Sequence, residues 1–211
     1  KEINPNIKII GVQAEGANAM EESFKSGSLI SLSSVNTIAD GIAVKSPGEL
    51  TFNLIREYVD DIVTVSDKEI AEAFLILCEK HKLLAEASGA ASLAALRKLN
   101  LCNKKVVSII SGGNIDMLTI SSLISDGLVE RGRLFCFSVE LPDIPGQLQE
   151  ISKILSELNA NVVQLEHNQF KASNRLKNVL LEVTVETNGL NHIELIKDTL
   201  NNHGFTIKQM Y

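Results

Sequence analysis

A short apolar run that ends in a double glycine, residues 106–114, predicts the architecture of this chain more strongly than any other segment. Its first five residues, Val-Val-Ser-Ile-Ile, predict a strand covered on both faces, as in a parallel sheet. Gly112 and Gly113 then allow a sharp backbone turn. Ser111 comes at the carboxyl end of the predicted strand, where open α/β sheets bind ligands. A double glycine is also an ordinary strand-to-helix turn, so a binding role and a purely structural role both stay open.

Strands and helices alternate around this run over the first 132 residues. The residue patterns predict strands at 7–14 and 61–65, and helices at 19–25, 47–58, 86–99 and 117–128. Ser66 and Glu69 form a capping-box pattern, which predicts that another helix begins there. Asn114 or Asp116 can cap the helix that follows the double glycine. This alternation predicts a parallel, three-layer α/β unit.

The periodicity changes near Gly132. Apolar and polar residues alternate at 135–141 and 181–186, which predicts the first and third strands of a new unit. The second strand is predicted at 163–167 and the fourth at 205–210. Helical spacing appears at 148–158 and 193–200. The order β-α-β-β-α-β predicts a ferredoxin-like unit with four antiparallel strands and two helices on one face. Because the other face is left open, we expect pairing with a second copy. The predicted domains are residues 1–132 and 133–211.

Composition excludes several functional classes. The chain of 211 residues has a net charge of −6, and both predicted domains are net negative, which argues against nucleic acid as a partner. No apolar run approaches the roughly 18 residues of a membrane span. The three scattered cysteines indicate free thiols in a reducing, cytoplasmic compartment. Since a buried-type strand comes almost at once and no initiator Met is present, we expect this chain to be the downstream piece of a longer protein.

Three motifs lie in the order and spacing of one enzyme family. They are IGVQAEGANAM at 10–20, TIADGIAV at 37–44 and SGGN at 111–114. The chain therefore resembles the carboxyl-terminal portion of threonine dehydratase (threonine ammonia-lyase), a fold type II enzyme that uses pyridoxal phosphate. The tail, with Asp-x-Pro-Gly-x-Leu at 143–148, resembles an ACT domain, a small-molecule sensor. The resemblance covers nearly the whole chain and implies an incomplete catalytic domain at 1–132 and a regulatory domain at 133–211.

The resemblance implies deamination of L-threonine to 2-oxobutanoate and ammonia, with L-serine also accepted. Pyridoxal phosphate acts as the electron sink in such enzymes. Ser111 matches the partner of the ring nitrogen and Gly112 belongs to the same motif, while Gly41 matches a backbone position beside the ring. A neutral hydroxyl leaves the ring nitrogen largely unprotonated and favours elimination of the β-hydroxyl. Glu86 matches an acidic residue close to the ring, although an acid is also favoured there by the helix dipole.

Two expected parts of the family are missing from this sequence. The Schiff-base lysine of the family lies in an S-x-K-x-R-G motif, and a glycine-rich loop holds the phosphate; neither occurs here. Lys25, in Ser-Phe-Lys-Ser-Gly, lacks the Arg-Gly that follows the family's lysine, so we expect it to be a solvated surface residue. The sequence therefore contains no catalytic residue, and we expect this fragment to be inactive alone.

A divalent cation site is a further candidate. In related serine racemases a cation lies between a carboxylate, a backbone carbonyl and a second carboxylate, at positions that match Glu15, Ala19 and Glu21. Hard cations prefer such oxygen ligands. Glu21 stands where the relatives have Asp, which makes this ligand one methylene longer. A turn followed by a solvated helix face explains the same residues without a metal.

In ACT domains the effector lies at an interface between two copies, near the first strand-helix turn. The turn predicted here can offer free amides at the helix N-terminus to the carboxylate of an amino acid. Two residues of the second strand match positions that can face the ligand. The predicted effector residues are Asp143, Pro145, Gly146, Gln147, Leu148, His167 and Asn168. The same Asp-Ile-Pro-Gly run is also simply a good turn, so both interpretations stay open.

Three functional hypotheses follow. The first is a threonine dehydratase with feedback regulation by a branched-chain product such as isoleucine. The second is a relative with different chemistry, a serine dehydratase or racemase. The third is that the isolated chain is an amino-acid-binding dimerisation module. The expected partners are a small amino acid as substrate and effector, and further copies of this chain in a homo-oligomer built through the ACT domains.

Overall fold

The computed structural model describes residues 1–174 and 176–210. The chain divides into two compact units, Lys1–Leu123 and Ile124–Tyr211. The division falls inside helix α5 (Met117–Glu130), upstream of the domain boundary that the sequence predicts at Gly132. Within the described residues, none of the helices combines the length and the apolar character that crossing a bilayer requires.

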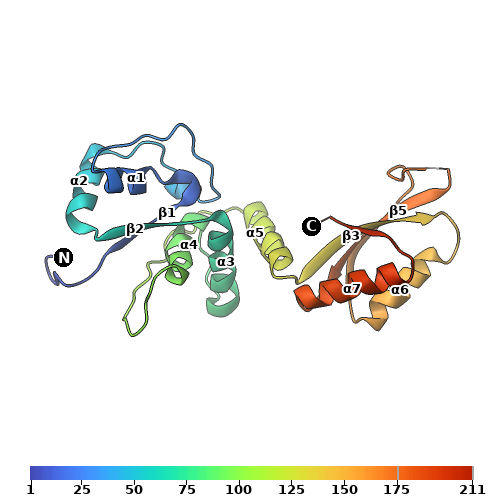
Figure 1. The fold of residues 1–211 in the computed structure, drawn as a ribbon. Coiled ribbons are helices and arrows are strands. Elements are labelled where there is room, and N and C mark those ends of the chain that lie inside the picture. Colours follow the sequence, from blue (N-terminus) through green and yellow to red (C-terminus); the bar gives the residue numbers. More distant parts are fainter. Residues whose placement is uncertain (175, 211) are drawn as a thin grey trace. The chain divides into compact units, whose positions relative to one another are not determined.

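The first unit is built on a parallel strand pair. Strand β1 (Ile10–Ala14) lies beside β2 (Asp61–Val65), with Ile10 opposite Asp61 and Ala14 opposite Val65. Figure 1 shows two helices above this pair, α1 (Ala19–Ser26) and α2 (Glu49–Tyr58), and two below it, α3 (Asp67–Ile76) and α4 (Ala87–Ala94). Short helical turns span Glu15–Ala17, Asp40–Ile42, Leu77–His81 and Ala95–Arg97. The predicted layering of helix, sheet and helix is therefore present around a two-stranded sheet.

Local signals determine where these helices begin and end. Ser66 Oγ accepts a hydrogen bond from the Glu69 amide at 3.3 Å, and Glu69 Oε2 accepts one from the Ser66 amide at 2.7 Å. The predicted capping box thus starts α3. Helix α1 ends at Gly27, whose φ of 74° is in the left-handed region that glycine favours. Asp116 Oδ1 accepts from the Leu118 amide at 2.9 Å and caps α5, one of the two caps that the sequence allowed.

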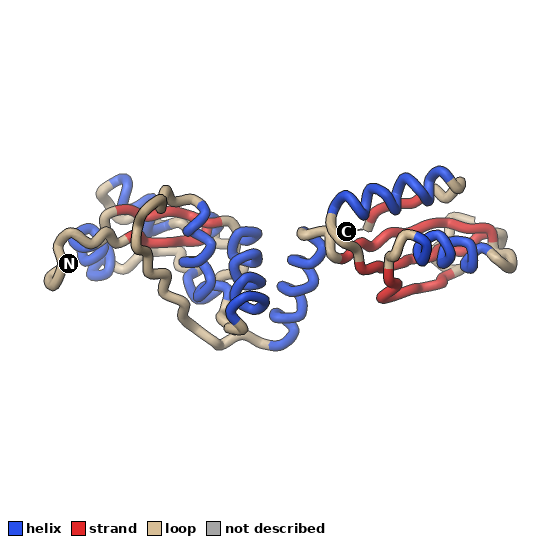
Figure 2. Tube along the Cα trace, turned by 90° about the horizontal axis from the view of Figure 1, so that it is seen from below, coloured by secondary structure: helices blue, strands red, loops and turns tan. Residues whose placement is uncertain are grey.

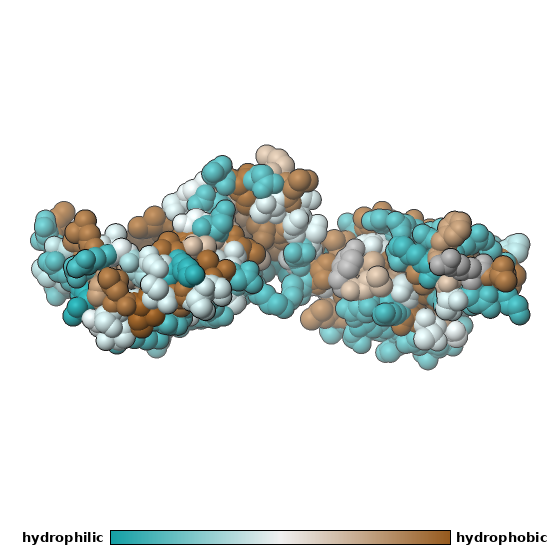
Figure 3. All heavy atoms as spheres, turned by 90° about the horizontal axis from the view of Figure 1, so that it is seen from above, coloured by the Kyte–Doolittle hydropathy of each residue, from teal (hydrophilic) through white to brown (hydrophobic). Residues whose placement is uncertain are grey.

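The strand predicted at 106–110 is wrong for the described residues. Residues 98–116, which lead into α5, are drawn as loop in Figure 2 and pair with no strand among the described residues. Val107 is 89% exposed and Ile109 is 75% exposed, so the cover expected on both faces is missing. An apolar run becomes a strand only where a neighbouring strand completes its hydrogen bonds, and the described residues supply none. Figure 3 shows that hydrophobic residues, in brown, lie on the surface seen from above.

The second unit confirms the predicted β-α-β-β-α-β order. Its elements are β3 (Leu134–Pro142), α6 (Gln147–Glu157), β4 (Asn161–Asn168), β5 (Asn178–Glu186), α7 (Leu190–Asn202) and β6 (Ile207–Gln209). The strands form one antiparallel sheet in the order β4-β5-β3-β6. Both helices cover the same face of this sheet (Figure 1).

The core of this unit lies between the sheet and its two helices. Residues that alternate along β3 and β5 meet residues at helical spacing on α6 and α7, and the largest of them are fully buried: Phe135, Phe137, Leu181, Ile151, Leu155, Ile196 and Leu200. Strand β4 is exposed along most of its length, including Val163 at 56% and Leu165 at 37%. The opposite face of the sheet is polar, as the alternation predicts.

Candidate functional site

One face of helix α4 holds the segment that contains the double glycine. Glu86, Gly89 and Ser92 are spaced by three, which places them on one side of a helix. The Glu86 amide donates to the Gly112 carbonyl at 3.3 Å, and Ser92 Oγ donates to the Ile109 carbonyl at 2.7 Å. Ser92 Oγ also lies 2.9 Å from Ser108 Oγ. The segment is therefore positioned by side chains and backbone of a helix rather than by a strand ladder.

Glycine is required at two points of this contact. A Cβ at Gly89 would overlap the Ser111 carbonyl oxygen and lie 2.7 Å from its carbonyl carbon. Gly112 has a φ of +72°, and a Cβ there would lie 2.6 Å from Glu86 Cγ. Any side chain at either position would collide with its neighbour. These two glycines let Ser111 and Gly112 approach the start of α4 closely.

A third glycine comes from a distant part of the chain. Gly41 lies in the helical turn Asp40–Ile42, and a Cβ there would be 2.6 Å from Ser88 Oγ and 3.1 Å from Glu86 Oε1. Ser88 Oγ donates a hydrogen bond to Glu86 Oε1 at 2.9 Å, which fixes the carboxylate. The structure thus brings Gly41, Glu86 and Gly112 together, with Ser111 adjacent, as the sequence analysis grouped them.

Ser88 and Gly89 are residues of this cluster that the sequence analysis did not identify. The signal for Gly89 was present in the spacing by three from Glu86 to Ser92, but its meaning depends on which segment faces that side of the helix. The cluster offers an exposed serine hydroxyl at Ser111, a carboxylate held by a second hydroxyl, and bare backbone at Gly41 and Gly112. A flat ring could approach such bare backbone closely.

An apolar hollow of about 300 Å³ adjoins the cluster. It lies between the strand pair and helix α2, and Gly41 is one of its lining residues together with Val12, Ile55 and Ile62. Gln13 is one of the polar side chains on its wall, and its Oε1 accepts from the Glu21 amide at 2.7 Å. The hollow therefore offers apolar surface beside a polar cluster, a common composition for small-molecule sites.

Two of the three predicted cation ligands, Glu15 and Glu21, are paired with lysine side chains. Lys98 Nζ lies 3.0 Å from Glu15 Oε1, 3.0 Å from Glu69 Oε2 and 2.9 Å from the Thr64 carbonyl. Hydrogen bonds to Glu69 and Glu15 raise the pKa of Lys98, so it stays a cation. Glu21 pairs with Lys25, whose side chain is 67% exposed as expected for a surface lysine.

Glu15 and Glu21 are thus each paired with a different ammonium group, and the divalent cation site stays a prediction. Both carboxylates already face an ammonium group, and a metal would have to displace both. Across residues 1–174 and 176–210, no group of three or more His, Cys, Asp or Glu side chains is placed to hold a metal ion. The plain interpretation of these residues, a turn and a helix face with ion pairs, explains what is observed.

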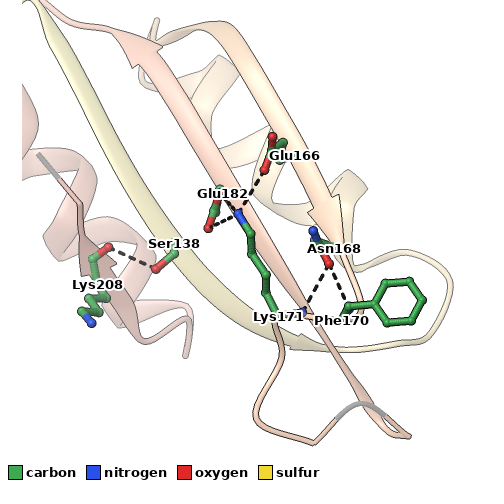
Figure 4. A network of polar contacts seen from close by, with 7 residues as sticks. All are labelled: Ser138, Glu166, Asn168, Phe170, Lys171, Glu182 and Lys208. Atoms are coloured by element: carbon green, nitrogen blue, oxygen red, sulfur yellow. Dashed lines mark hydrogen bonds and ion pairs between the residues drawn. The ribbon is translucent and has the colours of Figure 1, made fainter.

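The predicted effector residues lie around an exposed turn of the second unit. Gly146, with a φ of 102°, precedes Gln147 at the start of α6. Asp143 accepts a hydrogen bond from Gln169, which links this turn to the loop after β4. Asn168 Oδ1 accepts from the Phe170 amide at 2.9 Å and the Lys171 amide at 3.3 Å, and so caps that loop (Figure 4). Pro145, Leu148 and His167 are exposed.

Known proteins resemble this chain over both units. The family model "Pyridoxal-phosphate dependent enzyme" matches residues 1–112. The L-threonine ammonia-lyase of Thermotoga maritima is 41% identical over 209 residues, which is 99% of this chain and 52% of that protein. This chain spans about half the length of the curated relatives that it matches over both units.

Solved structures resemble the chain over a smaller part. The processed form of threonine deaminase isoform 2 from Solanum lycopersicum has a TM-score of 0.54 and 35% identity, covering 59% of this chain and 36% of that chain. Maize serine racemase has a TM-score of 0.53 and 35% identity, covering 62% of this chain and 41% of that chain. The resemblance to solved structures therefore includes both a threonine deaminase and a serine racemase.

Proposed function

The chain belongs to the family of pyridoxal-phosphate dependent enzymes, and on that premise we propose that it is part of a threonine dehydratase. The proposed reaction converts L-threonine into 2-oxobutanoate and ammonia. The observation that carries this proposal is the contact among Gly41, Glu86 and Gly112 beside Ser111. Identity of 41% to a threonine ammonia-lyase along nearly the whole chain supports it. Because the chain spans about half of such relatives, the activity is proposed for the whole polypeptide.

The residues of the cluster fit the family's cofactor, pyridoxal phosphate. A Cβ at Gly41 or Gly112 would fill the space beside Glu86, so glycine keeps backbone available to a flat ring. The Ser111 hydroxyl is exposed and has no hydrogen-bond partner among the described residues, so it can donate to the ring nitrogen. When bound, the cofactor supplies an electron sink for bond breaking at the substrate's α-carbon.

Ser111 and Glu86 would have different roles in this reaction. A neutral hydroxyl at Ser111 does not protonate the ring nitrogen, which moderates the electron sink and favours loss of the β-hydroxyl group. The Glu86 carboxylate, held by Ser88 at 2.9 Å, would lie close to the ring with a fixed orientation. Glu86 is also the N-cap residue of α4, where the helix dipole favours a negative charge.

The test joins this chain to the part of the Thermotoga enzyme that it does not match. L-Threonine and L-serine are offered to the chain alone and to the fusion, and 2-oxobutanoate, pyruvate and D-serine are measured. We expect activity on threonine only from the fusion, because this chain lacks the S-x-K-x-R-G motif. Ser111→Ala should lower it by about tenfold or more, since a hydrogen bond made in the transition state is lost, whereas Ser121→Ala on exposed α5 should not.

Two outcomes would contradict this assignment. A folded fusion that binds pyridoxal phosphate but forms no 2-oxobutanoate would refute the dehydratase. D-Serine as the main product would favour the alternative, a serine racemase, which the likeness to the maize enzyme supports.

We further propose that the second unit is an ACT domain that senses an amino acid. Its β-α-β-β-α-β order and the turn at Asp143–Leu148 support this proposal. On β4, Val162 and Val163 are exposed and the outer edge pairs with no strand among the described residues, which suits pairing with a second copy. Free cysteines at 78, 102 and 136 support a reducing, cytoplasmic location.

Regulation of the proposed enzyme is tested by titrating the chain with isoleucine. We expect saturable binding that Gly146→Asp abolishes, because a carboxylate at the start of α6 would repel the carboxylate of the ligand. Sedimentation should show a dimer. A folded monomer that binds no isoleucine would refute both the sensor for this amino acid and the proposed pairing.

A further inference from the structure

The turn between β5 and α7, residues 187–190, holds the point where the chain passes from α5 into β3. The Thr187 amide donates to the Arg133 carbonyl at 2.9 Å, and the Gly189 amide donates to the Gly132 carbonyl at 3.0 Å. The Thr187 hydroxyl, on a residue that is buried, donates to the same Gly132 carbonyl. Arg133 Nε donates back to the Thr187 carbonyl at 3.2 Å. Four hydrogen bonds therefore tie the turn to this connection.

The connection and the turn also fit closely. Gly132 has a φ of +62°, and a Cβ there would lie 2.7 Å from the Leu190 amide nitrogen. No side chain would fit between them at that distance. A movement of the turn is therefore transmitted directly to the connection between α5 and β3.

His192 holds the turn from the other side. Its Nδ1 accepts a hydrogen bond from the Asn188 amide at 3.0 Å, and its Nε2 lies 2.8 Å from the Leu158 carbonyl. Leu158 is the C-cap residue of α6, where carbonyl groups lack partners within the helix. The ring is half-buried and links α6 to α7, which lie side by side on the sheet (Figure 1).

These two contacts require one form of the ring. A backbone amide can only donate, so Nδ1 must be without a proton; a carbonyl can only accept, so Nε2 must carry one. The ring is therefore neutral and in a single tautomer. A second proton, on Nδ1, would place two donors face to face. His192 also lies in the first turn of α7, where the helix dipole opposes a positive charge.

No carboxylate is placed to neutralise a second proton on this ring. The charged residues nearest in sequence to the turn and its contacts are Glu130, Arg131, Arg133, Glu157, Glu186 and Glu194. Three of these carboxylates have other partners, which are Lys153 for Glu157 (3.9 Å), Asn161 for Glu186 (2.9 Å) and Lys197 for Glu194 (2.8 Å). In the described part of the chain, the His192 ring bonds only the two backbone groups.

His203 at the other end of α7 has the opposite arrangement. It is the C-cap residue of the helix, and its Nδ1 lies 2.8 Å from the Thr199 carbonyl. A proton on Nδ1 makes this contact a donated hydrogen bond, and the helix dipole favours a positive charge at this end. Protonation therefore suits the contact of His203 and breaks that of His192.

We propose that His192 is a pH-sensitive switch for the connection between α5 and β3. The neutral ring fixes the turn at residues 187–190 to the end of α6. The protonated ring releases the Asn188 amide, and the turn and the connection that it holds become mobile together. This inference does not depend on the proposed dehydratase or sensor, because it uses no residue of the cofactor cluster or of the effector turn.

The experiment records NMR spectra of the whole ¹⁵N-labelled chain between about pH 8 and about pH 5, the range in which imidazoles change charge. At the upper end, the His192 ring should carry its proton on Nε2. As the ring gains its second proton, the amides of Asn188 and Gly189 should lose protection against hydrogen exchange by about fivefold or more, because a hydrogen bond becomes a repulsive contact.

Two variants assign the effect to one ring. His192→Asn keeps an acceptor near the position of Nδ1 but gains no proton in this range, so the protection of Asn188 should no longer depend on pH. His203→Asn is the matched control on the same helix, and it should leave the pH dependence at Asn188 unchanged.

Three results would overturn the switch. The first is a His192 ring that carries its proton on Nδ1 at about pH 8. The second is protection of Asn188 and Gly189 that persists after the ring has gained its second proton. The third is a loss of protection in His192→Asn that still depends on pH. If that variant fails to fold, the unchanged chain decides, because the amides of His203 and Gly204 should stay protected while those of Asn188 and Gly189 do not; equal loss at both ends of α7 would refute the inference.

Discussion

Replacing Gly89 by alanine tests the docking of α4 on residues 108–112. In an ordinary helix interior this change stabilises a protein by about 1 kcal/mol, because alanine has the higher helix propensity. Here the added Cβ would lie 2.7 Å from the Ser111 carbonyl carbon and overlap its oxygen. Carbon atoms in contact prefer about 3.5–4.0 Å, so the carbonyl carbon alone requires a retreat of roughly 1 Å, and the nearer oxygen requires a larger one.

A retreat of that size removes the contacts that hold the segment. Three hydrogen bonds hold it. Ser92 Oγ donates to the Ile109 carbonyl at 2.7 Å and also bonds Ser108 Oγ. The Glu86 amide donates to the Gly112 carbonyl at 3.3 Å. Three such bonds contribute about 1 kcal/mol each. After the helix gain of about 1 kcal/mol is subtracted, we expect a net destabilisation of about 2 kcal/mol.

Thermal unfolding followed by circular dichroism measures this loss, and amide NMR shifts of residues 108–112 locate it. Gly48→Ala at the start of α2 is the matched control, because its Cβ would meet Thr51 Oγ1 at 3.2 Å and nothing closer. That control should change stability by about 1 kcal/mol or less, as expected for an alanine replacing an N-cap residue. A Gly89→Ala chain that unfolds at the same or a higher temperature, with unchanged signals at 108–112, would refute the proposed docking.

The remaining predictions concern separate parts of the chain. Ser66→Ala should cost about 1 kcal/mol in urea denaturation, because α3 loses its capping box; an unchanged midpoint would contradict this. Burial acts to raise the pKa of Glu69, but hydrogen bonds from Ser66 and Lys98 outweigh it and lower the pKa below 4.5. The ionised Glu69 carboxylate therefore stabilises the fold fully above pH 4.5, and this stabilisation is lost as the pH falls through the lowered pKa. Unfolding measured at several pH values should show this loss in the unchanged chain and not in Glu69→Gln. Leu155→Ala should destabilise the second unit by about 2–5 kcal/mol, measured by its hydrogen exchange, because the side chain is fully buried. Val107→Ser should change stability by about 0.5 kcal/mol or less, since Val107 is 89% exposed; a large loss would show that it is covered.

Much of the fold could be predicted because its signals are local. The capping box of Ser66 and Glu69 and the glycine at the end of α1 act within a few residues, and both are observed. The alternation along β3 and β5 and the helical spacing on α6 and α7 identify faces of single elements. The strand at 106–110 failed for the opposite reason, since a strand requires a partner that the apolar pattern itself does not specify.

The candidate site shows the same limit. The grouping of Gly41, Glu86, Ser111 and Gly112 came from a family resemblance, and their proximity could not be deduced from spacing alone. The ion pair of Glu15 could not be predicted either, because its partner Lys98 is 83 residues away in the sequence. Gly89 was missed because its spacing by three from Glu86 and Ser92 gains a meaning only once Ser111 is known to approach that side of the helix.

The docking of α4 also has a kinetic consequence. Its contacts join residues that are close in sequence, since Ser92 meets Ser108 and Ile109 at separations of 16 and 17 residues. Closing so short a loop costs little chain entropy, whereas the bond between Lys98 and Glu15 must close a span of 83 residues. Local contacts of this kind form early in folding. The surface made by Glu86, Ser111 and Gly112, where we propose that the cofactor binds, would then be ordered before the parallel strand pair forms.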